Sequence, residues 1–265
     1  MLTTTLDDPS AVRPVAHGRA VTIGAFDGVH LGHRAVLRLL RDLAHARDLT
    51  ATVLTFDRHP AEVVRPALPP KVLTTLPQKL ELLAATKTVD ECVILPFDEE
   101  RSHETAERFV EELLASCLHT RLVVVGSDFH FGFRRHGDIA LLQRMGAELG
   151  FEALGLGLVA SPDGSIAADG AYPYSSTRVR ALLAAGDVEG VAAILGRTHE
   201  IRGDLTREDD TDVVLVSSRI CVPMPGLYRT DQGIARVRHD EAESVRRVEV
   251  EGAVDGSVRF VARAE

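Results

Sequence analysis

The chain has 265 residues, of which 45% are hydrophobic and 26% charged, as in ordinary soluble globular proteins, and this length fits one large domain or a good-sized domain with a small one. Its formal net charge of -9 argues against a nucleic-acid-binding surface, although local arginines still allow anionic small substrates. Three scattered cysteines predict neither a disulfide framework nor a zinc site, and the lack of a long apolar stretch or signal core predicts a cytoplasmic protein without a membrane segment.

Residues 1–19 are polar and irregular in pattern, and we expect them to form an N-terminal arm. After them, short apolar runs typical of buried strands alternate with segments whose apolar residues recur at helical spacing. The expected strands are 20–23, 51–56, 92–97, 122–126 and 153–160, and the expected helices are 31–47, 77–86, 105–118 and 138–149. This alternation predicts an α/β domain over 20–203, a Rossmann-like parallel sheet covered on both faces, whose ligands bind beyond the carboxyl ends of the strands.

The end of the first expected strand carries the phrase Gly24-Ala-Phe-Asp-Gly-Val-His-Leu-Gly-His33. A strand that runs through a glycine turn into a helix directs free backbone N–H groups and a positive dipole end at one point, which favours a phosphate. His30 and His33 lie on one side of the first helical turn, and Gly32 leaves room for a ligand to approach the backbone. Protonated imidazoles would stabilise charge on a phosphate. The alternative is a plain strand–turn–helix with two exposed histidines.

Two further loops follow expected strands at the same end of the sheet. In 55–60, Asp57 is placed to hold a positioning hydrogen bond before Pro60. In 126–132, Phe129 and Phe131 stand between two glycines, and basic residues follow at 134–136. Aromatic rings beside cations suit a flat ring system that carries a phosphate. The same rings can instead fill the core while the basic residues lie in solvent, and the sequence leaves both interpretations open.

The phrase Ser175-Ser-Thr-Arg-Val-Arg180 opens another expected helix. A serine at such a position normally caps the helix, which explains one hydroxyl, either Ser175 or Ser176. The remaining hydroxyls together with Arg178 and Arg180 exceed what a cap needs and are suited to polyphosphate. We expect this helix start to face the first glycine turn, because two anion sites are what the triphosphate of ATP requires.

From about Gly203 the pattern changes. Residues 204–212 are expected to form a charged linker, and short alternating runs follow at 213–217, 233–238, 245–251 and 258–262. Period-two alternation without intervening helices predicts a small antiparallel sheet or open barrel over 204–265. About sixty residues are marginal for independent stability, so we expect this part to depend on the first domain.

Taken together, these motifs resemble the nucleotidylyltransferase superfamily, and the inserted Phe-Asp-Gly of the first phrase resembles bacterial FAD synthetases, the bifunctional riboflavin kinase/FMN adenylyltransferase family. The matching pieces occur in order along most of the chain: 24–33, 55–60, 125–132 with 137–138, 175–180 and 195–203. The resemblance implies transfer of AMP from ATP to FMN, giving FAD and pyrophosphate, with Mg²⁺ bound to the ATP and several of its waters retained.

The resemblance also implies roles for individual residues. His30 and His33 would contact the phosphates of ATP, His33 would stabilise the transition state, and Asp27 would shape the catalytic turn. The predicted ATP-binding residues are Gly24, Phe26, Gly28, Gly32, Ser176, Thr177, Arg178 and Arg180. The predicted FMN-binding residues are Asp57, Asp128, Phe129 and Phe131, and no protein ligand for a metal is predicted.

The chain departs from the family's pattern after Gly203. The Gly-rich turn and the Pro-Thr-Ala-Asn phrase of the kinase module do not occur there, and only 225–228 faintly resembles a kinase strand. We therefore expect no riboflavin kinase activity, and a reduced riboflavin-kinase-like β domain with a structural or docking role. The alternatives are a nucleotidylyltransferase for another phosphorylated acceptor and a non-catalytic flavin- or nucleotide-binding regulator. Neither nucleic acid nor a membrane is an expected partner, and the oligomeric state stays open.

Overall fold

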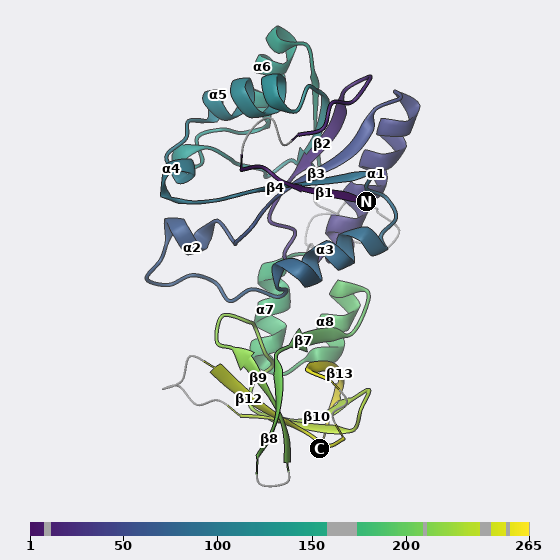
Figure 1. Cartoon of the computed structure of the whole chain (residues 1–265), viewed down its shortest axis with the longest axis vertical. Helices are drawn as coiled ribbons and strands as arrows, with labels where there is room; N and C mark the ends of the chain where they lie inside the picture. Colours follow the sequence, from purple (N-terminus) through teal and green to yellow (C-terminus); the bar gives the residue numbers. More distant parts are fainter. Residues whose placement is uncertain (8–11, 158–173, 209–210, 239–244, 253–254, 265) are drawn as a thin grey trace. The chain divides into compact units, whose positions relative to one another are not determined.

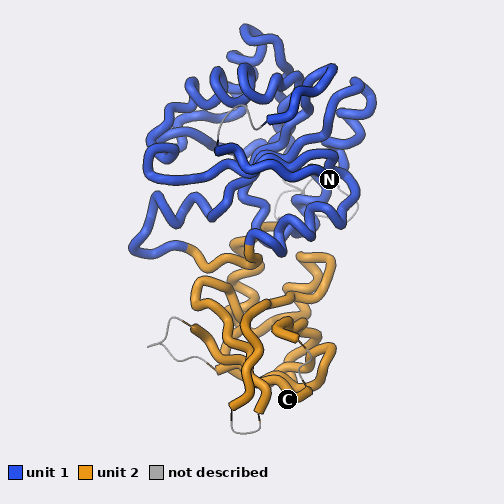
Figure 2. Tube along the Cα trace, viewed as in Figure 1, with its two compact units in different colours: residues 1–69, 76–173 blue, residues 70–75, 174–265 orange. Residues whose placement is uncertain are grey.

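The computed structural model describes residues 1–7, 12–157, 174–208, 211–238, 245–252 and 255–264, and it divides into two compact units (Figure 2). Unit 1 comprises residues 1–69 and 76–173, and unit 2 comprises residues 70–75 and 174–265. These units follow spatial packing, whereas the predicted boundaries 1–19, 20–203 and 204–265 follow sequence motifs. The predicted boundaries therefore stay a prediction about functional modules.

Unit 1 is built on a six-stranded parallel sheet in the order β1-β4-β3-β2-β5-β6. Figure 1 labels β1 to β4 of this sheet. The strands are β1 (Leu2–Thr5), β2 (Arg19–Ile23), β3 (Thr50–Phe56), β4 (Glu91–Leu95), β5 (Thr120–Gly126) and β6 (Glu152–Leu156). In the central strand, Val21 pairs with Thr52 on one side and with Val123 on the other. The predicted parallel sheet is confirmed. The end of the last expected strand, residues 158–160, lies outside the described residues.

Helices cover both faces of this sheet, as predicted. The helices described in unit 1 are α1 (Leu31–Ala46), α2 (Ala61–Val64), α3 (Leu76–Ala85), α4 (Glu99–Ser102), α5 (Ala106–Arg108), the π-helix η2 (Phe109–Cys117), the 3-10 helix η3 (Phe133–Arg135) and α6 (Ile139–Leu149). Because side chains alternate along a strand, Leu122 and Val124 pack with α1, whereas Val123 and Val125 pack with η2 and α6. The long apolar strands are buried on both sides for this reason.

The N-terminal segment differs from the irregular arm expected for residues 1–19. Leu2–Thr5 forms β1, which pairs in parallel with β4, so that Leu2 lies opposite Glu91. Strand β1 is mostly exposed and lies at the edge of the sheet. Pairing on an edge is decided by the neighbouring strand and less by the sequence's own alternation, which is why the pattern did not reveal it.

The order of the strands fixes where a ligand would bind in unit 1. From β2 the chain continues through α1 to β3 on one side, while β5 lies on the other side of β2. The carboxyl ends of β2 and β5 therefore meet at the point where the strand order reverses, which is the usual ligand site of open α/β sheets. The segments that leave these two ends are the turn 24–30 and the loop 127–132.

Unit 2 contains a seven-stranded antiparallel sheet, as predicted in kind, in the order β7-β13-β10-β11-β12-β9-β8. Its elements are α7 (Ser176–Ala185), α8 (Val188–Leu195), β7 (His199–Arg202), β8 (Asp204–Glu208), β9 (Thr211–Ser217), β10 (Gly226–Thr230), β11 (Ile234–Val237), β12 (Val245–Val250) and β13 (Ser257–Arg263). The sheet shares one hydrophobic core with α7 and α8, which includes the fully buried Tyr228 and Phe260. These helices supply apolar surface that the β region alone lacks.

One expectation for this region was wrong. Residues 204–212 were expected to form a charged linker, but Asp204–Glu208 is strand β8, paired antiparallel with β9. Strand β8 lies at the edge of the sheet, and its side chains are exposed or half-buried. Edge strands in natural proteins are often charged because charge discourages pairing with other chains, so a charged composition did not exclude a strand.

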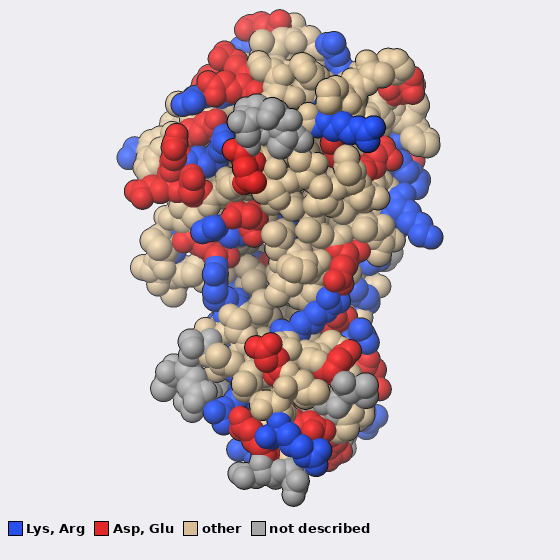
Figure 3. All heavy atoms as spheres, viewed as in Figure 1, with Lys and Arg blue, Asp and Glu red and all other residues tan. Residues whose placement is uncertain are grey.

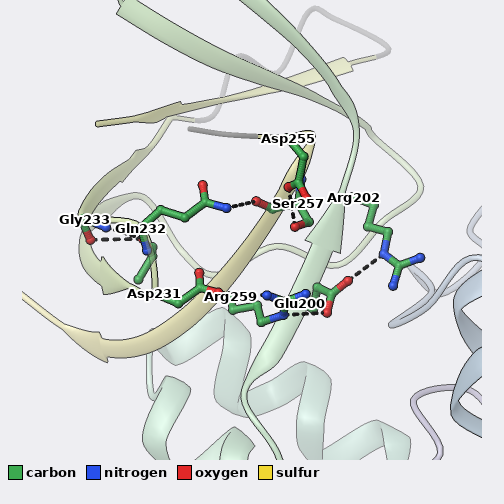
Figure 4. A network of polar contacts seen from close by, with 9 residues as sticks. Glu200, Arg202, Asp231, Gln232, Gly233, Asp255, Ser257 and Arg259 are labelled. Carbon is green, nitrogen blue, oxygen red and sulfur yellow. Dashed lines mark hydrogen bonds and ion pairs between the residues drawn. The ribbon is translucent and has the colours of Figure 1, made fainter. Parts of the chain in front are cut away.

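An ion-pair network ties one end of this sheet together (Figure 4). Arg259 of β13 donates to Glu200 of β7 at 2.9 Å and to Asp231 at 2.8 Å, and Arg202 also donates to Glu200. The network thereby joins β7 and β13 to the turn after β10. Since its side chains are partly in solvent, it contributes little stability beside the buried core.

Acidic and basic side chains are interspersed on both units over the face drawn in Figure 3. On this face, positive potential for an anionic ligand would have to come from local groups such as helix N-termini, and less from a broad basic surface. In the described part of the chain, no helix has the length and apolar character that a membrane crossing requires.

Candidate active site

The turn between β2 and α1 holds an unusual backbone conformation. Phe26 and Val29 have φ values of +49° and +40°, and Gly28 has a φ of +83°. A positive φ is costly for a β-branched residue such as Val29 and persists only where the surroundings enforce it. Here the side chains of Phe26 and Val29 are buried, at 4% and 0% exposure. Such strain gathers at functional sites, and four residues predicted to serve the site lie in this turn: Gly24, Phe26, Asp27 and Gly28.

His30 and His33 are joined to each other at the start of α1. His30 is the N-cap of the helix, and its Nδ1 accepts a hydrogen bond from the backbone N–H of His33 at 3.3 Å. In a neutral His30 the ring proton is therefore on Nε2. The two rings stack with centroids 3.6 Å apart and planes 18° apart. The helix start and the histidine spacing are as predicted, whereas the stacking was not anticipated.

The charge state of His33 without a ligand follows from its surroundings, and the expected protonated form beside an anion stays a prediction. Burial first, then the neighbouring His30 and Lys79, lower the pKa of His33 well below its ordinary value. Its Nδ1 is buried and has no hydrogen-bond partner among the described residues. The tilted Phe26 ring, 5.0 Å away, adds to the apolar surroundings. His33 is therefore neutral in the absence of a ligand, and its protonation requires an anion nearby.

A buried lysine beneath this turn was missed by sequence reasoning. Lys79 of α3 is 6% exposed, and its Nζ donates to the carbonyl of Ala25 at 3.2 Å, to Thr55 Oγ1 at 3.1 Å and to the carbonyl of Phe56 at 2.8 Å. Burial lowers the pKa of Lys79 to about 8, against the opposing influence of Asp27, Cys92 and Asp57. A signal was present, because a lysine in an otherwise apolar helical pattern indicates either a solvent-facing position or a buried, functional one.

Asp27 of the turn and Asp57 of the loop after β3 both act electrostatically on Lys79. Asp27 is 5% exposed, and its charge raises the pKa of Lys79. Asp57 Oδ1 accepts the backbone N–H of Phe97 at 2.9 Å, and its carboxylate also binds Arg58. The predicted positioning hydrogen bond of Asp57 is confirmed. A contact of Asp57 with FMN stays a prediction.

The loop after β5 shows which of its aromatic rings are in the core. Phe131 is 8% exposed and packs against Phe109 of η2, with ring centroids 5.5 Å apart. Phe129 stacks on Phe131 at 5.4 Å and is only partly buried. Gly132 permits this packing, since a Cβ there would lie 2.6 Å from the backbone nitrogen of Ala106. Phe131 therefore belongs to the core. The exposed Asp128 and the partly buried Phe129 have more surface for a ligand, and all three FMN contacts stay predictions.

The second predicted phosphate segment lies in unit 2. Ser175 is the N-cap of α7, and its Oγ accepts the backbone N–H of Arg178 at 3.2 Å. Ser176 and Thr177 are therefore not needed as the cap and stand in the first helical turn. Arg180 donates from Nε to the carbonyl of Lys71 at 2.6 Å, which fixes its side chain. Contacts of Ser176, Thr177, Arg178 and Arg180 with ATP, together with a joint site with the turn of unit 1, stay predictions.

Unit 1 thus has a parallel sheet whose central strand ends in a strained glycine turn at the point of strand reversal, followed by a helix that begins with paired histidines. These features define the class of Rossmann-like α/β domains. Residues 12–167 match the sequence model of the FAD synthetase family. The chain belongs to the FAD synthetase family.

Curated relatives agree with this family. The bifunctional riboflavin kinase/FMN adenylyltransferase of Haemophilus influenzae is 36% identical over 189 residues, which are 71% of this chain and 58% of that protein. The Escherichia coli K12 protein of the same name is 35% identical and covers 73% of this chain and 59% of its own length. The one from Pseudomonas fluorescens is 34% identical and covers 82% and 69%. The chain thus spans somewhat less than two thirds of the first two relatives.

One solved structure is similar over the whole chain. A protein from Streptococcus pneumoniae described as a macrolide-efflux protein superposes with a TM-score of 0.78 and 20% sequence identity, covering 100% of this chain and 91% of its own. At this identity the likeness shows the fold alone.

Proposed function

We propose that the protein is an FMN adenylyltransferase that transfers AMP from ATP to FMN and releases pyrophosphate. Membership of the FAD synthetase family supports this activity, as do relatives whose names include FMN adenylyltransferase. The observation that carries the proposal is the stacked pair His30 and His33 at a helix N-terminus beside a strained turn. A helix N-terminus and nearby imidazole donors are suited to stabilising charge on a phosphate.

In the proposed mechanism the phosphate of FMN attacks the α-phosphorus of ATP in line, and pyrophosphate leaves. The nucleophile is already an anion, so no general base is required and catalysis depends on positioning and charge stabilisation. The Nε2–H of His30 would donate to a phosphate oxygen. His33, whose pKa is lowered by burial in the free protein, would take up a proton as the triphosphate approaches, since a nearby negative charge raises the pKa of an imidazole.

ATP would enter as its magnesium complex. The described residues contain no group of three or more histidine, cysteine, aspartate or glutamate side chains placed to hold a metal ion. The phosphates and water would therefore supply most of the ligands, as Mg²⁺ readily allows. The first turn of α7, with Ser176, Thr177, Arg178 and Arg180, would bind the triphosphate, and Asp57, Asp128, Phe129 and Phe131 would contact FMN. We place this reaction in the cytoplasm, where ATP is made available.

The experiment is incubation of the purified protein with FMN, ATP and Mg²⁺, with FAD and pyrophosphate separated and quantified. We expect FAD to form in proportion to enzyme, and His30→Gln and His33→Gln to reduce it strongly. No FAD from well-folded wild-type protein would refute the proposal. A panel of other phosphorylated acceptors distinguishes a different acceptor. Retained FMN and ATP binding without any transfer would instead support a regulator.

A parallel reaction with riboflavin and ATP tests the C-terminal part. We propose that it forms no FMN, because the sequence after Gly203 lacks the phosphate-binding phrase of the kinase module. The sheet of unit 2 would then act as a reduced barrel with a structural or docking role. FMN formed from riboflavin at a rate comparable to FAD formation would contradict this part of the proposal and leave the adenylyltransferase proposal intact.

A further inference from the structure

The ammonium group of Lys79 joins three segments that are distant in sequence. Lys79 lies on α3, and its three hydrogen bonds reach the turn after β2 at Ala25 and the end of β3 at Thr55 and Phe56. Thr55 Oγ1 in turn donates to the carbonyl of Ala25 at 3.3 Å. The start of the turn that carries His30 and His33 is therefore attached to the neighbouring strand through one nitrogen atom.

All donors of this group are used. An ammonium has three N–H bonds, and Lys79 makes three hydrogen bonds to oxygens of the protein, at 2.8 to 3.2 Å. With 6% exposure, it has neither a spare donor nor an open path to a ligand. Lys79 would therefore act on a bound nucleotide through the turn it holds, and less through direct contact.

The choice of lysine is itself informative. The chain contains 30 lysines and arginines, of which only Lys71, Lys79 and Lys87 are lysines. Three oxygens that converge on one point suit a compact ammonium, whereas a planar guanidinium directs its donors outward in a fork. In a chain that uses arginine almost everywhere, this position has the one cation type that fits such an arrangement.

The positive charge of Lys79 is stabilised by hydrogen bonds to neutral polar groups. Its hydrogen-bond acceptors are two carbonyls and a hydroxyl, and the carboxylates of Asp27 and Asp57 act on it only at longer range. The groups that face it are Asp27, Asp57 and the buried Cys92, and its charge is felt by His33. A buried cation of this kind is costly for stability, and such a cost is common where function requires the group.

We propose that Lys79 is a positioning residue of the candidate active site: its ammonium group fixes the strained turn 24–30 to the end of β3, and so holds His30 and His33 in place for the phosphates. As an account of catalysis this inference rests on the proposed adenylyl transfer. As an account of the turn, it stands on the three hydrogen bonds alone.

The test compares Lys79→Met and Lys79→Arg with the control Lys87→Met, which removes an exposed lysine just beyond the same helix. We expect Lys79→Met to lower kcat for FAD formation about 100-fold, the size of effect that misplacement of reacting groups produces, with a much smaller change in KM for ATP. Lys79→Arg keeps the charge but not the three-point geometry, so it should remain nearly as slow. Lys87→Met should match the wild type. A normal kcat in Lys79→Met, or full recovery in Lys79→Arg, would overturn the proposal.

A second measurement does not depend on catalysis. An NMR titration of the histidine rings, with His33 assigned by its absence in His33→Gln, follows the pKa of His33 without substrates. Removing the charge in Lys79→Met should raise the pKa of His33 and change the hydrogen exchange of the 24–30 amides, whereas Lys87→Met should do neither. Unchanged His33 titration and unchanged exchange would refute the positioning role, even if no FAD is formed by the wild type. No FAD with these changes present would refute only the proposed function.

The wild type provides a further test should Lys79→Met not fold. Its rate of FAD formation should fall as Lys79 loses its proton near pH 8, since one of the three hydrogen-bond donors is lost there. Burial raises the pKa of Cys92 to about 12, so this thiol does not account for such a fall. A rate that stays constant through this range would overturn the proposal.

Discussion

The two ends of the parallel sheet in unit 1 each contain a buried cation, and the two are held in opposite ways. At the amino ends of the strands, the fully buried Arg19 binds Glu91 through Nε at 2.7 Å and through a second nitrogen at 3.2 Å, and it also donates to the carbonyls of Leu118 and Arg13. At the carboxyl ends, Lys79 donates to three neutral oxygens of the described residues.

The difference separates stability from function. A bidentate arginine–carboxylate pair cancels its own charge, so the amino end of the sheet has a closed, neutral network that also includes Thr52. At the carboxyl end Lys79 lies beneath a strained turn without a hydrogen-bonded carboxylate, and its positive charge lowers the pKa of His33. In open α/β sheets it is the carboxyl end that binds ligands. The cation that lacks a hydrogen-bonded carboxylate therefore lies at the end of the sheet where a ligand would bind.

The largest change in the free energy of unfolding is expected at the amino ends of the strands. Arg19→Met leaves Glu91 buried without its partner, and breaking a buried ion pair in this way lowers the free energy of unfolding by about 3–5 kcal/mol. Urea denaturation measures this change. The matched control is Arg47→Met, which removes an exposed ion pair with Glu152 and should cost less than about 1 kcal/mol. The kcat of the Arg19 variant, per folded molecule, should be unchanged, and a selective loss of kcat would break the comparison.

The sequence predicted the strands and helices better than it predicted the buried cations Arg19 and Lys79. Regular spacing of apolar residues located β2 to β5 and the long helices to within a few residues, because buried strands and amphipathic helices carry strong periodic signals. Edge strands such as β1 and β8 carry weak signals, and Arg19 pairs with Glu91 across 72 positions. Lys79 was missed because its partners include two backbone carbonyls, which no motif identifies. The histidines were found because a helix N-terminus after a glycine turn has a recognisable local pattern.

The second prediction concerns His33, at the carboxyl ends of the strands. His33→Gln removes a ring that would stabilise charge on the phosphates, and loss of one such group typically lowers kcat by about 10²–10³-fold, or about 2.7–4 kcal/mol. The free energy of unfolding should change little, because His33 Nδ1 has no hydrogen bond to lose among the described residues. His45→Gln, an exposed histidine on the same helix, is the control. Steady-state kinetics beside urea unfolding tests both, and a large loss of stability with a normal kcat would make His33 a structural residue.

The third prediction uses pH to distinguish the two cations. Burial lowers the pKa of Lys79 from 10.5 to about 8, so between these values the unfolded chain binds more protons than the folded one. The free energy of unfolding should therefore rise with pH across this window, by on the order of 3 kcal/mol in all, while the full cost of the buried charge is present below pH 8. Comparison of the wild type with Lys79→Met at several pH values isolates this contribution. Parallel stability curves for the two proteins would show that Lys79 carries no such cost.

The smallest effect is expected at the cap of α7, and it calibrates the others. Ser175 makes one neutral hydrogen bond to the backbone N–H of Arg178, so Ser175→Ala should lower the free energy of unfolding of unit 2 by about 1 kcal/mol. If Ser175 serves only as the cap, ATP binding by isothermal titration should be nearly unchanged. Ser176→Ala should do the reverse, weakening ATP binding with little loss of stability, because Ser176 is not the cap. Equal effects of both substitutions on ATP binding would show that the helix cap and the phosphate contacts are not separable. Structural and functional roles would then be shared by the same polar groups in unit 2, whereas in unit 1 they fall to different residues at the two ends of the sheet.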